Sequence, residues 1–136
     1  MSYNDKDVVI LRGLPGSGKS SLAKLLSGGN DDLVCEADAF CMDEDGNYNW
    51  KPERVGYTHK MCLDKFKSLV NKNESKIIVS NTGVKYREFK EYVKYAELNG
   101  YRVTITIVEN YHGNKSVHDV PEESITKMRE RFQVNL

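Results

Sequence analysis

This sequence of 136 residues has three cysteines, no net charge and no long apolar run. The three cysteines, Cys35, Cys41 and Cys62, are odd in number and lack Cys-x-x-Cys spacing. That pattern argues against a disulfide scaffold and indicates free thiols in a reducing compartment. No apolar stretch is long enough to span a bilayer, and no signal peptide is recognisable. We therefore expect a cytoplasmic protein with no membrane partner.

The charges of the chain cancel, since 20 Lys and Arg residues face 20 Asp and Glu residues. Proteins that coat nucleic acid nonspecifically neutralise its phosphates with an excess of basic residues. A net charge of zero argues against that class, although it still allows local contact with one strand end. The length suits a single domain over residues 1–136 with one proper core.

The segment from Gly13 to Ser20 has the complete pattern Gly-x-x-x-x-Gly-Lys-Ser of a phosphate-binding loop. An apolar run at 8–11 precedes it, and 21–26 suits the start of a helix, so a chance glycine-rich turn is disfavoured. Lys19 would reach the β- and γ-phosphates of a nucleoside triphosphate, and the Ser20 hydroxyl would ligate Mg²⁺. The predicted nucleotide-binding residues are Gly13, Leu14, Pro15, Gly16, Ser17, Gly18, Lys19, Ser20 and Ser21.

Apolar runs and helical patterns alternate along the chain. Buried strands are predicted at 8–11, 33–35 and 77–79, and helices at 21–26, 52–70, 86–98 and from Pro121 onward. A fourth strand is predicted at 103–108, where threonine alternates with valine and isoleucine, so one of its faces should be less deeply buried. This alternation predicts an α/β fold with three layers, the P-loop NTPase fold. Its sheet would be mostly parallel, with four to five strands and helices on both faces. Ligands of such sheets bind beyond the carboxyl ends of the strands.

Asp38 follows the second predicted strand and is the main candidate beyond the loop. A carboxylate there can accept the proton of an attacking hydroxyl or hold Mg²⁺, and we favour those roles over a helix N-cap. Because alternate strand residues face opposite ways, we expect Glu36 to point elsewhere. At the end of the third strand, Asn81 and Thr82 could orient a substrate or a metal-bound water, but residue type alone favours a capped turn.

Residues 109–120, between the last strand and the last helix, are predicted to form a short lid over the nucleotide. Small phosphate-loop kinases carry a cation in this region that meets the transferring phosphoryl group. Lys115 is the first candidate for that cation and His118 a conditional second one, although either could be an ordinary surface residue.

Beyond the loop, the chain resembles the polynucleotide-kinase-like phosphate-loop family, which includes phage-type 5′-hydroxyl polynucleotide kinase domains and NEDD4-binding-protein-2-like domains. The resemblance rests on an ordered set of matches: Leu11–Ser20, Asp38, Asp45–Tyr48, His59, Asn81–Thr82, Asn99–Tyr101, His118–Pro121 and Met128–Phe132. It implies ATP as the nucleotide and Asp38 as the general base that activates the acceptor hydroxyl. It also adds Arg131 to the nucleotide-binding residues.

The chain departs from the family's pattern at three places. Ser80 stands where the family commonly has an aspartate, which leaves the Mg²⁺ shell to Ser20 and Asp38. Ala39, Phe40 and Cys41 follow the acidic position, where the family uses an arginine or an alanine to meet the acceptor strand. The lid is short, and Lys115 is the residue closest to the family's lid arginine.

Three functions follow from these observations. The first is an ATP- and Mg²⁺-dependent kinase that transfers the γ-phosphoryl group to a 5′-hydroxyl of a polynucleotide, with Lys19, Asp38 and Lys115 as catalytic residues. Its partners would be a nucleotide and a nucleic-acid 5′ end. The second keeps the chemistry with a nucleoside, nucleotide or other small hydroxyl metabolite as acceptor. The third is a nucleotide-binding module with weak or no catalysis.

Overall fold

A computed structural model describes residues 5–38, 55–109 and 122–134 of the chain. Its parallel sheet contains β1 (Asp7–Arg12), β2 (Val34–Cys35), β3 (Lys76–Asn81) and β4 (Arg102–Ile107). The strand order is β2-β3-β1-β4, with β1 and β3 in the centre. The α/β fold and the parallel sheet predicted from the sequence are therefore confirmed.

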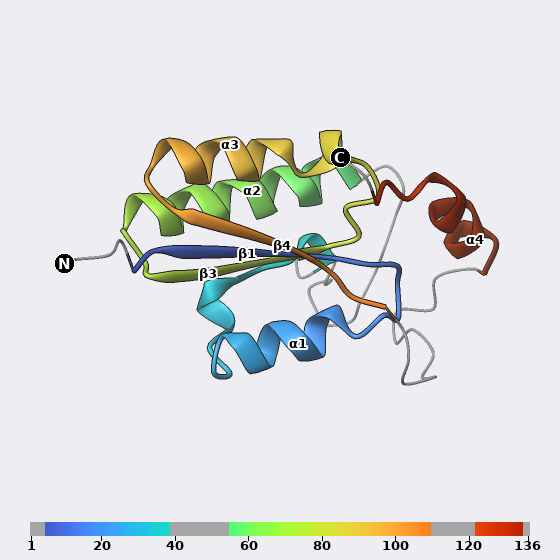
Figure 1. Cartoon of the computed structure of the whole chain (residues 1–136), viewed down its shortest axis with the longest axis horizontal. Helices are drawn as coiled ribbons and strands as arrows, with labels where there is room; N and C mark the ends of the chain where they lie inside the picture. Colours follow the sequence, from blue (N-terminus) through green and yellow to red (C-terminus); the bar gives the residue numbers. More distant parts are fainter. Residues whose placement is uncertain (1–4, 39–54, 110–121, 135–136) are drawn as a thin grey trace.

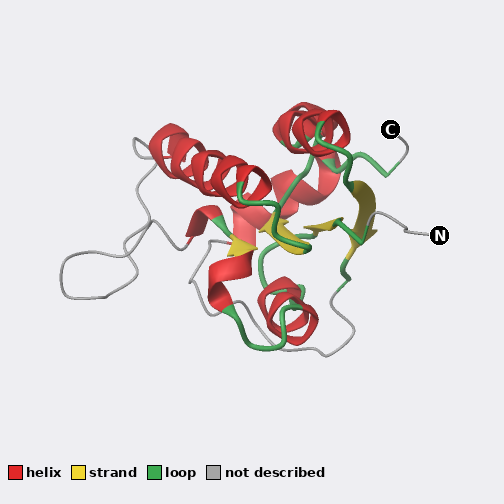
Figure 2. Cartoon of the chain, turned by 90° about the vertical axis from the view of Figure 1, so that its left-hand side faces the viewer, coloured by secondary structure: helices red, strands yellow, loops and turns green. Residues whose placement is uncertain are grey.

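Helices cover both faces of this sheet (Figure 1). Helix α1 (Lys19–Leu26) lies on one face, and α2 (Val55–Asn71) and α3 (Lys90–Leu98) lie together on the other. Figure 2 gives a view along the strands, with the sheet between the helix layers. Helix α4 (Glu122–Arg131) lies beyond the carboxyl ends of the strands. None of the helices in the described part of the chain is both long and apolar enough to cross a membrane.

The burial of each strand follows its position in the sheet. The central strands β1 and β3 are apolar on both faces and pair Val8 with Ile77 and Ile10 with Val79. Such continuous apolar runs are typical of strands with helices on both sides. The edge strand β4 is half exposed, as its mixture of threonine with valine and isoleucine predicted. Strand β2 is shorter than expected, because the preceding 3-10 turn extends to Leu33.

The helix predicted over 86–98 is two elements in the structure. A 3-10 turn, η4 (Tyr86–Glu88), is followed by α3, and Phe89 between them has φ −129° and ψ 4°. The Phe89 side chain is buried in the core, so it interrupts the helix where it packs. The predicted start of the second helix at Pro52 lies outside the described residues.

Candidate nucleotide-binding and phosphoryl-transfer site

The phosphate-binding loop starts where three strands meet. The Gly13 N–H donates to the Thr82 carbonyl at 3.0 Å, and the Val108 N–H donates to the Arg12 carbonyl at 2.7 Å. A Cβ atom on Gly13 would lie 2.6 Å from the Val108 carbonyl oxygen and 2.5 Å from Ser17 Oγ. Glycine is therefore required at the first position of the loop, because backbone and side chain crowd it from two sides.

The loop ends at an uncapped helix N-terminus. Gly18 is the N-cap of α1 with φ 101°, in the left-handed region, and no side chain caps the helix. The first turn of α1 also holds no acidic residue. Free N–H groups and the positive end of the helix dipole therefore favour an anion here. The remaining predicted nucleotide-binding residues, Leu14, Pro15, Gly16, Ser17, Ser20 and Ser21, belong to this loop or to the first turn of α1.

Lys19 folds its side chain back over the loop. Its ammonium donates to the carbonyls of Gly13 at 2.7 Å and Leu14 at 3.1 Å. Burial lowers the pKa of Lys19 to about 8, while the negative charges of Asp38 and Glu36 oppose that shift. The structure thus brings both carboxylates within electrostatic reach of the lysine that is predicted to hold the phosphates.

The position of Glu36 differs from the expectation that its side chain points away from the site. Ser20 Oγ donates a hydrogen bond of 3.0 Å to Glu36 Oε1. The reason lies in strand alternation: Cys35 is buried in the core beneath α2 and α3, whereas Val34 packs with the cluster beneath α1. Glu36, two residues after Val34, therefore lies on the α1 face. The sequence offered no signal for this contact, because a two-residue strand that is apolar on both faces does not reveal which face is which.

Asn81 fixes the turn that carries Asp38. Its Oδ1 accepts a hydrogen bond of 2.9 Å from the Ala37 N–H, and its Nδ2 donates to Cys62 Sγ at 3.6 Å. The sequence favoured a capped turn before the next helix, whereas Asn81 binds the segment after β2 instead. Asp38 itself is exposed beyond this turn. Asn81 thus links β3 and α2 to the predicted general base.

Arg12 is a site-flanking residue that the sequence reasoning missed. It is 1% exposed, and its guanidinium donates to the carbonyls of Gly83 at 2.7 Å and of Gln133. The guanidinium also lies against the rings of Phe89, 4.7 Å from the centroid, and Phe132, 4.6 Å. Arginine directly after the buried run at 8–11 was the available signal, because a charge at the end of a core strand requires buried partners.

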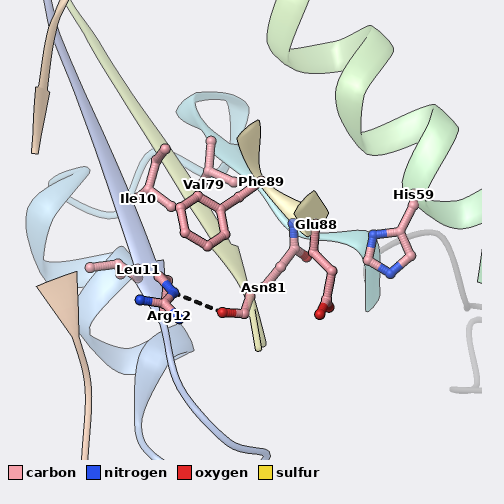
Figure 3. A pocket seen from close by; sticks show the side chains of 9 residues that line it. Ile10, Leu11, Arg12, His59, Val79, Asn81, Glu88 and Phe89 are labelled. Carbon is pink, nitrogen blue, oxygen red and sulfur yellow. Dashed lines mark hydrogen bonds between the residues drawn. The ribbon is translucent and has the colours of Figure 1, made fainter. Parts of the chain in front are cut away.

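A small cavity lies beside Arg12, between the ends of β1 and β3 and His59 of α2 (Figure 3). Arg12, Asn81, Glu88 and His59 supply its polar groups, and its volume of about 10 Å³ admits about one water. Among the described residues this space is too small for a nucleotide or a sugar.

Several predicted features lie outside the described residues: Lys115, His118, most of the lid at 109–120, and Ala39, Phe40 and Cys41. Arg131 is exposed at the end of α4, where its Nε donates to the Lys127 carbonyl of the same helix at 3.3 Å. Cys35 and Cys62 are free thiols, as predicted. Within the described ranges, no three His, Cys, Asp or Glu side chains cluster as a metal site would require.

Fold and site together define a phosphate-loop protein of the kinase-like type, and sequence comparison agrees. Residues 8–134 match the protein family described as "AAA domain", and the chain belongs to this family of P-loop kinase-like domains. The chain is also 31% identical over 141 residues to NEDD4-binding protein 2 from Homo sapiens. That match covers 97% of this chain but 8% of the human protein, so the chain spans less than a tenth of this relative.

Solved structures of similar fold include two kinases and a chain of a multiprotein complex. A chain of the Pnkp1/Rnl/Hen1 complex has a TM-score of 0.58 and 19% identity, over 93% of this chain and 40% of that chain. A gluconokinase from Sinorhizobium meliloti 1021 has a TM-score of 0.54 and 13% identity, over 97% and 77% of the two chains. The APS kinase CysC of Mycobacterium tuberculosis has a TM-score of 0.52 and 14% identity, over 93% and 96%. At these identities the likeness shows the fold alone.

Proposed function

We propose that the chain is an ATP- and Mg²⁺-dependent kinase that phosphorylates a 5′-hydroxyl of a polynucleotide. The observation that carries the proposal is the pairing of a complete phosphate-binding loop with the carboxylate of Asp38, which acts electrostatically on Lys19. A base beside a triphosphate site suits transfer to a hydroxyl better than simple hydrolysis. The identity with human NEDD4-binding protein 2 and the ordered family motifs support a polynucleotide as acceptor.

In this mechanism each residue has a separate task. Lys19 and the N–H groups of the loop hold the β- and γ-phosphates. Asp38 accepts the proton of the acceptor hydroxyl, whose oxygen forms the new bond to the γ-phosphorus. The bond from that phosphorus to the β–γ bridging oxygen breaks, and ADP leaves. Lys115 and Arg131 are proposed as further cations toward the nucleotide, with 109–120 as the lid.

A bound Mg²⁺ would supply positive charge to the phosphates, and the residues present fit it. Magnesium at a nucleotide keeps several waters and uses one or two carboxylates beside the phosphates, so a cluster of three protein ligands is not required. The exposed Ser20 hydroxyl at the start of α1 and the exposed Asp38 carboxylate after β2 are of these donor types. Ser20 and Asp38 are the proposed metal-binding residues in this assignment.

The experiment offers labelled ATP together with RNA and DNA oligonucleotides that carry 5′-hydroxyl ends. We expect label on the oligonucleotides, and loss of that label in Asp38→Asn. Asp32→Asn is the matched control, because Asp32 is an exposed carboxylate before β2. A parallel reaction with a pool of small hydroxyl metabolites tests the alternative acceptors. Label on metabolites alone, or ATP binding without turnover, would contradict the proposal.

A further inference from the structure

The end of β3 lacks the negative charge that the family resemblance expects there. Ser80 pairs with Leu11 in the sheet. It lies two residues after Ile78, which packs beneath α1. Ser80 therefore lies on the α1 face of the sheet, the same face as the phosphate-binding loop and Ser20. Its side chain is 5% exposed, and its hydroxyl has no hydrogen-bond partner among the described residues. A neutral group thus occupies the position where the resemblance places a carboxylate for the metal.

Glu36 brings a carboxylate to the same face from the neighbouring strand. The last paired residues of β2 and β3 are Cys35 and Val79, so the next residues in line are Glu36 and Ser80. The carboxylate reaches across to α1 and accepts the hydrogen bond from Ser20 at 3.0 Å. When the Ser20 hydroxyl donates a hydrogen bond to Glu36, the lone pairs of the Ser20 oxygen remain available to a cation. This orientation suits a hydroxyl that acts as a metal ligand.

We propose that Glu36 is the carboxylate of the magnesium site, in partnership with Ser20, and that it replaces the acidic residue missing at Ser80. This proposal rests on the proposed nucleotide-dependent function and revises its metal site, with Glu36 in place of Asp38. It also separates the two carboxylates after β2, because Glu36 then serves the cation and Asp38 is free to act as the base. One carboxylate beside the phosphates is sufficient for Mg²⁺, which retains waters at its other positions.

The test measures Mn²⁺, used as the probe for the cation site, by the spin-resonance signal of the free ion. The full chain is titrated in the presence of a non-hydrolysable ATP analogue. We expect Glu36→Gln to weaken Mn²⁺ binding by at least about 10- to 100-fold, the usual range for loss of a group that is hydrogen-bonded to a metal ligand. Glu97→Gln, an exposed carboxylate of α3, removes the same charge away from the loop and should leave Mn²⁺ affinity unchanged.

Binding of the same analogue in EDTA separates the metal role from a structural one. Glu36→Gln should bind the metal-free analogue as tightly as the wild type or more tightly, because it removes a negative charge near the phosphates. Unchanged Mn²⁺ affinity, or an equal loss of affinity for the metal-free analogue, would overturn the Glu36 proposal. A wild-type chain that binds the analogue in neither buffer would contradict the proposed function, and Glu36 with it.

Moving the carboxylate back to β3 gives an independent check. Glu36→Gln combined with Ser80→Asp should recover Mn²⁺ affinity to within about tenfold of the wild type, because the charge returns to the same face. Thermal unfolding confirms first that the double variant is folded. A folded double variant that recovers no Mn²⁺ affinity would contradict the inference that Glu36 replaces a carboxylate at position 80.

Discussion

The two faces of the sheet differ in what they bury. The face beneath α2 and α3 carries a large apolar cluster, including Val8, Ile10, Phe66 and Ile77, each at most 1% exposed. The face beneath α1 carries a small one, formed by Leu11, Ala23 and Ile78 with partly buried neighbours. At its carboxyl end the small cluster gives way to the phosphate loop.

This difference indicates that stability and chemistry are divided between the faces. Apolar burial, the dominant source of folding free energy, is concentrated under α2 and α3. Two of the three buried hydroxyls that lack hydrogen-bond partners within the described ranges, Ser17 and Ser80, lie on the α1 face, and the third, Tyr92, lies on α3. Unpartnered buried polar groups cost stability and are commonly kept where a ligand or ion uses them. Substitutions on the two faces should therefore fail in different ways.

The largest expected effect is on the α2 and α3 face. Phe66 is fully buried and packs edge-on against Tyr92, with ring centroids 5.0 Å apart. Phe66→Ala should lower the free energy of unfolding by about 3–5 kcal/mol, because it leaves a large cavity. Leu25→Ala on α1, where the side chain is 76% exposed, should change it by less than about 0.5 kcal/mol. Denaturant unfolding measures both changes in free energy. Equal losses from the two substitutions would contradict the division of stability and chemistry between the faces.

The next effect is on chemistry at the α1 face. Lys19→Met keeps the length of the side chain but removes the charge that is proposed to hold the phosphates. We expect phosphoryl transfer to fall by at least about 10²–10³-fold, as for other charge-stabilising donors. The unfolding midpoint should not fall, because burial opposes the Lys19 charge in the folded state. Lys24→Met, an exposed lysine of the same helix, is the control, and similar losses in both would refute the assignment.

Asn81 holds the turn before Asp38 through partners on the α2 and α3 face, so its removal tests how far that face supports the candidate site. Asn81→Ala leaves the Ala37 N–H without its acceptor and loosens the turn before Asp38. We expect kcat to fall by about 10- to 100-fold from misplacement of the base, with little change in the KM for ATP. Asn81→Asp retains an acceptor and should recover part of kcat. An unchanged kcat in the alanine variant would show that Asp38 needs no such support.

The smallest expected effect is a pH dependence confined to the α1 face. The pKa of Lys19 is lowered to about 8 by burial, so its charge is lost as pH rises through about 8. Affinity for metal-free ATP should therefore fall about tenfold between pH 7 and pH 9. Between about 8 and the ordinary value of 10.5, the unfolded chain holds a proton that the folded chain lacks, so stability should rise with pH. Lys19→Arg should abolish both trends, since arginine stays charged.

Much of this architecture could be predicted from local sequence. Gly13, Gly18 and Lys19 follow from a pattern whose spacing is set by the phosphate, and the central strands follow from uninterrupted apolar runs. The contacts of Glu36 and Arg12 could not be predicted in the same way. Glu36 meets Ser20 because of the register between β2 and β3, and Arg12 meets Gln133 from the other end of the chain. Both depend on packing between segments distant in sequence, on which local periodicity carries no information.

Arg12 also sets a lower limit for the length of the folded unit. Arg12 directly precedes Gly13 in the chain. Its guanidinium packs against the Phe132 ring and donates a hydrogen bond to the Gln133 carbonyl. A chain cut between α4 and Phe132 would leave that buried cation short of an acceptor beside the phosphate loop. The boundary of an independently folding fragment therefore runs to Gln133 at least, although α4 itself ends at Arg131.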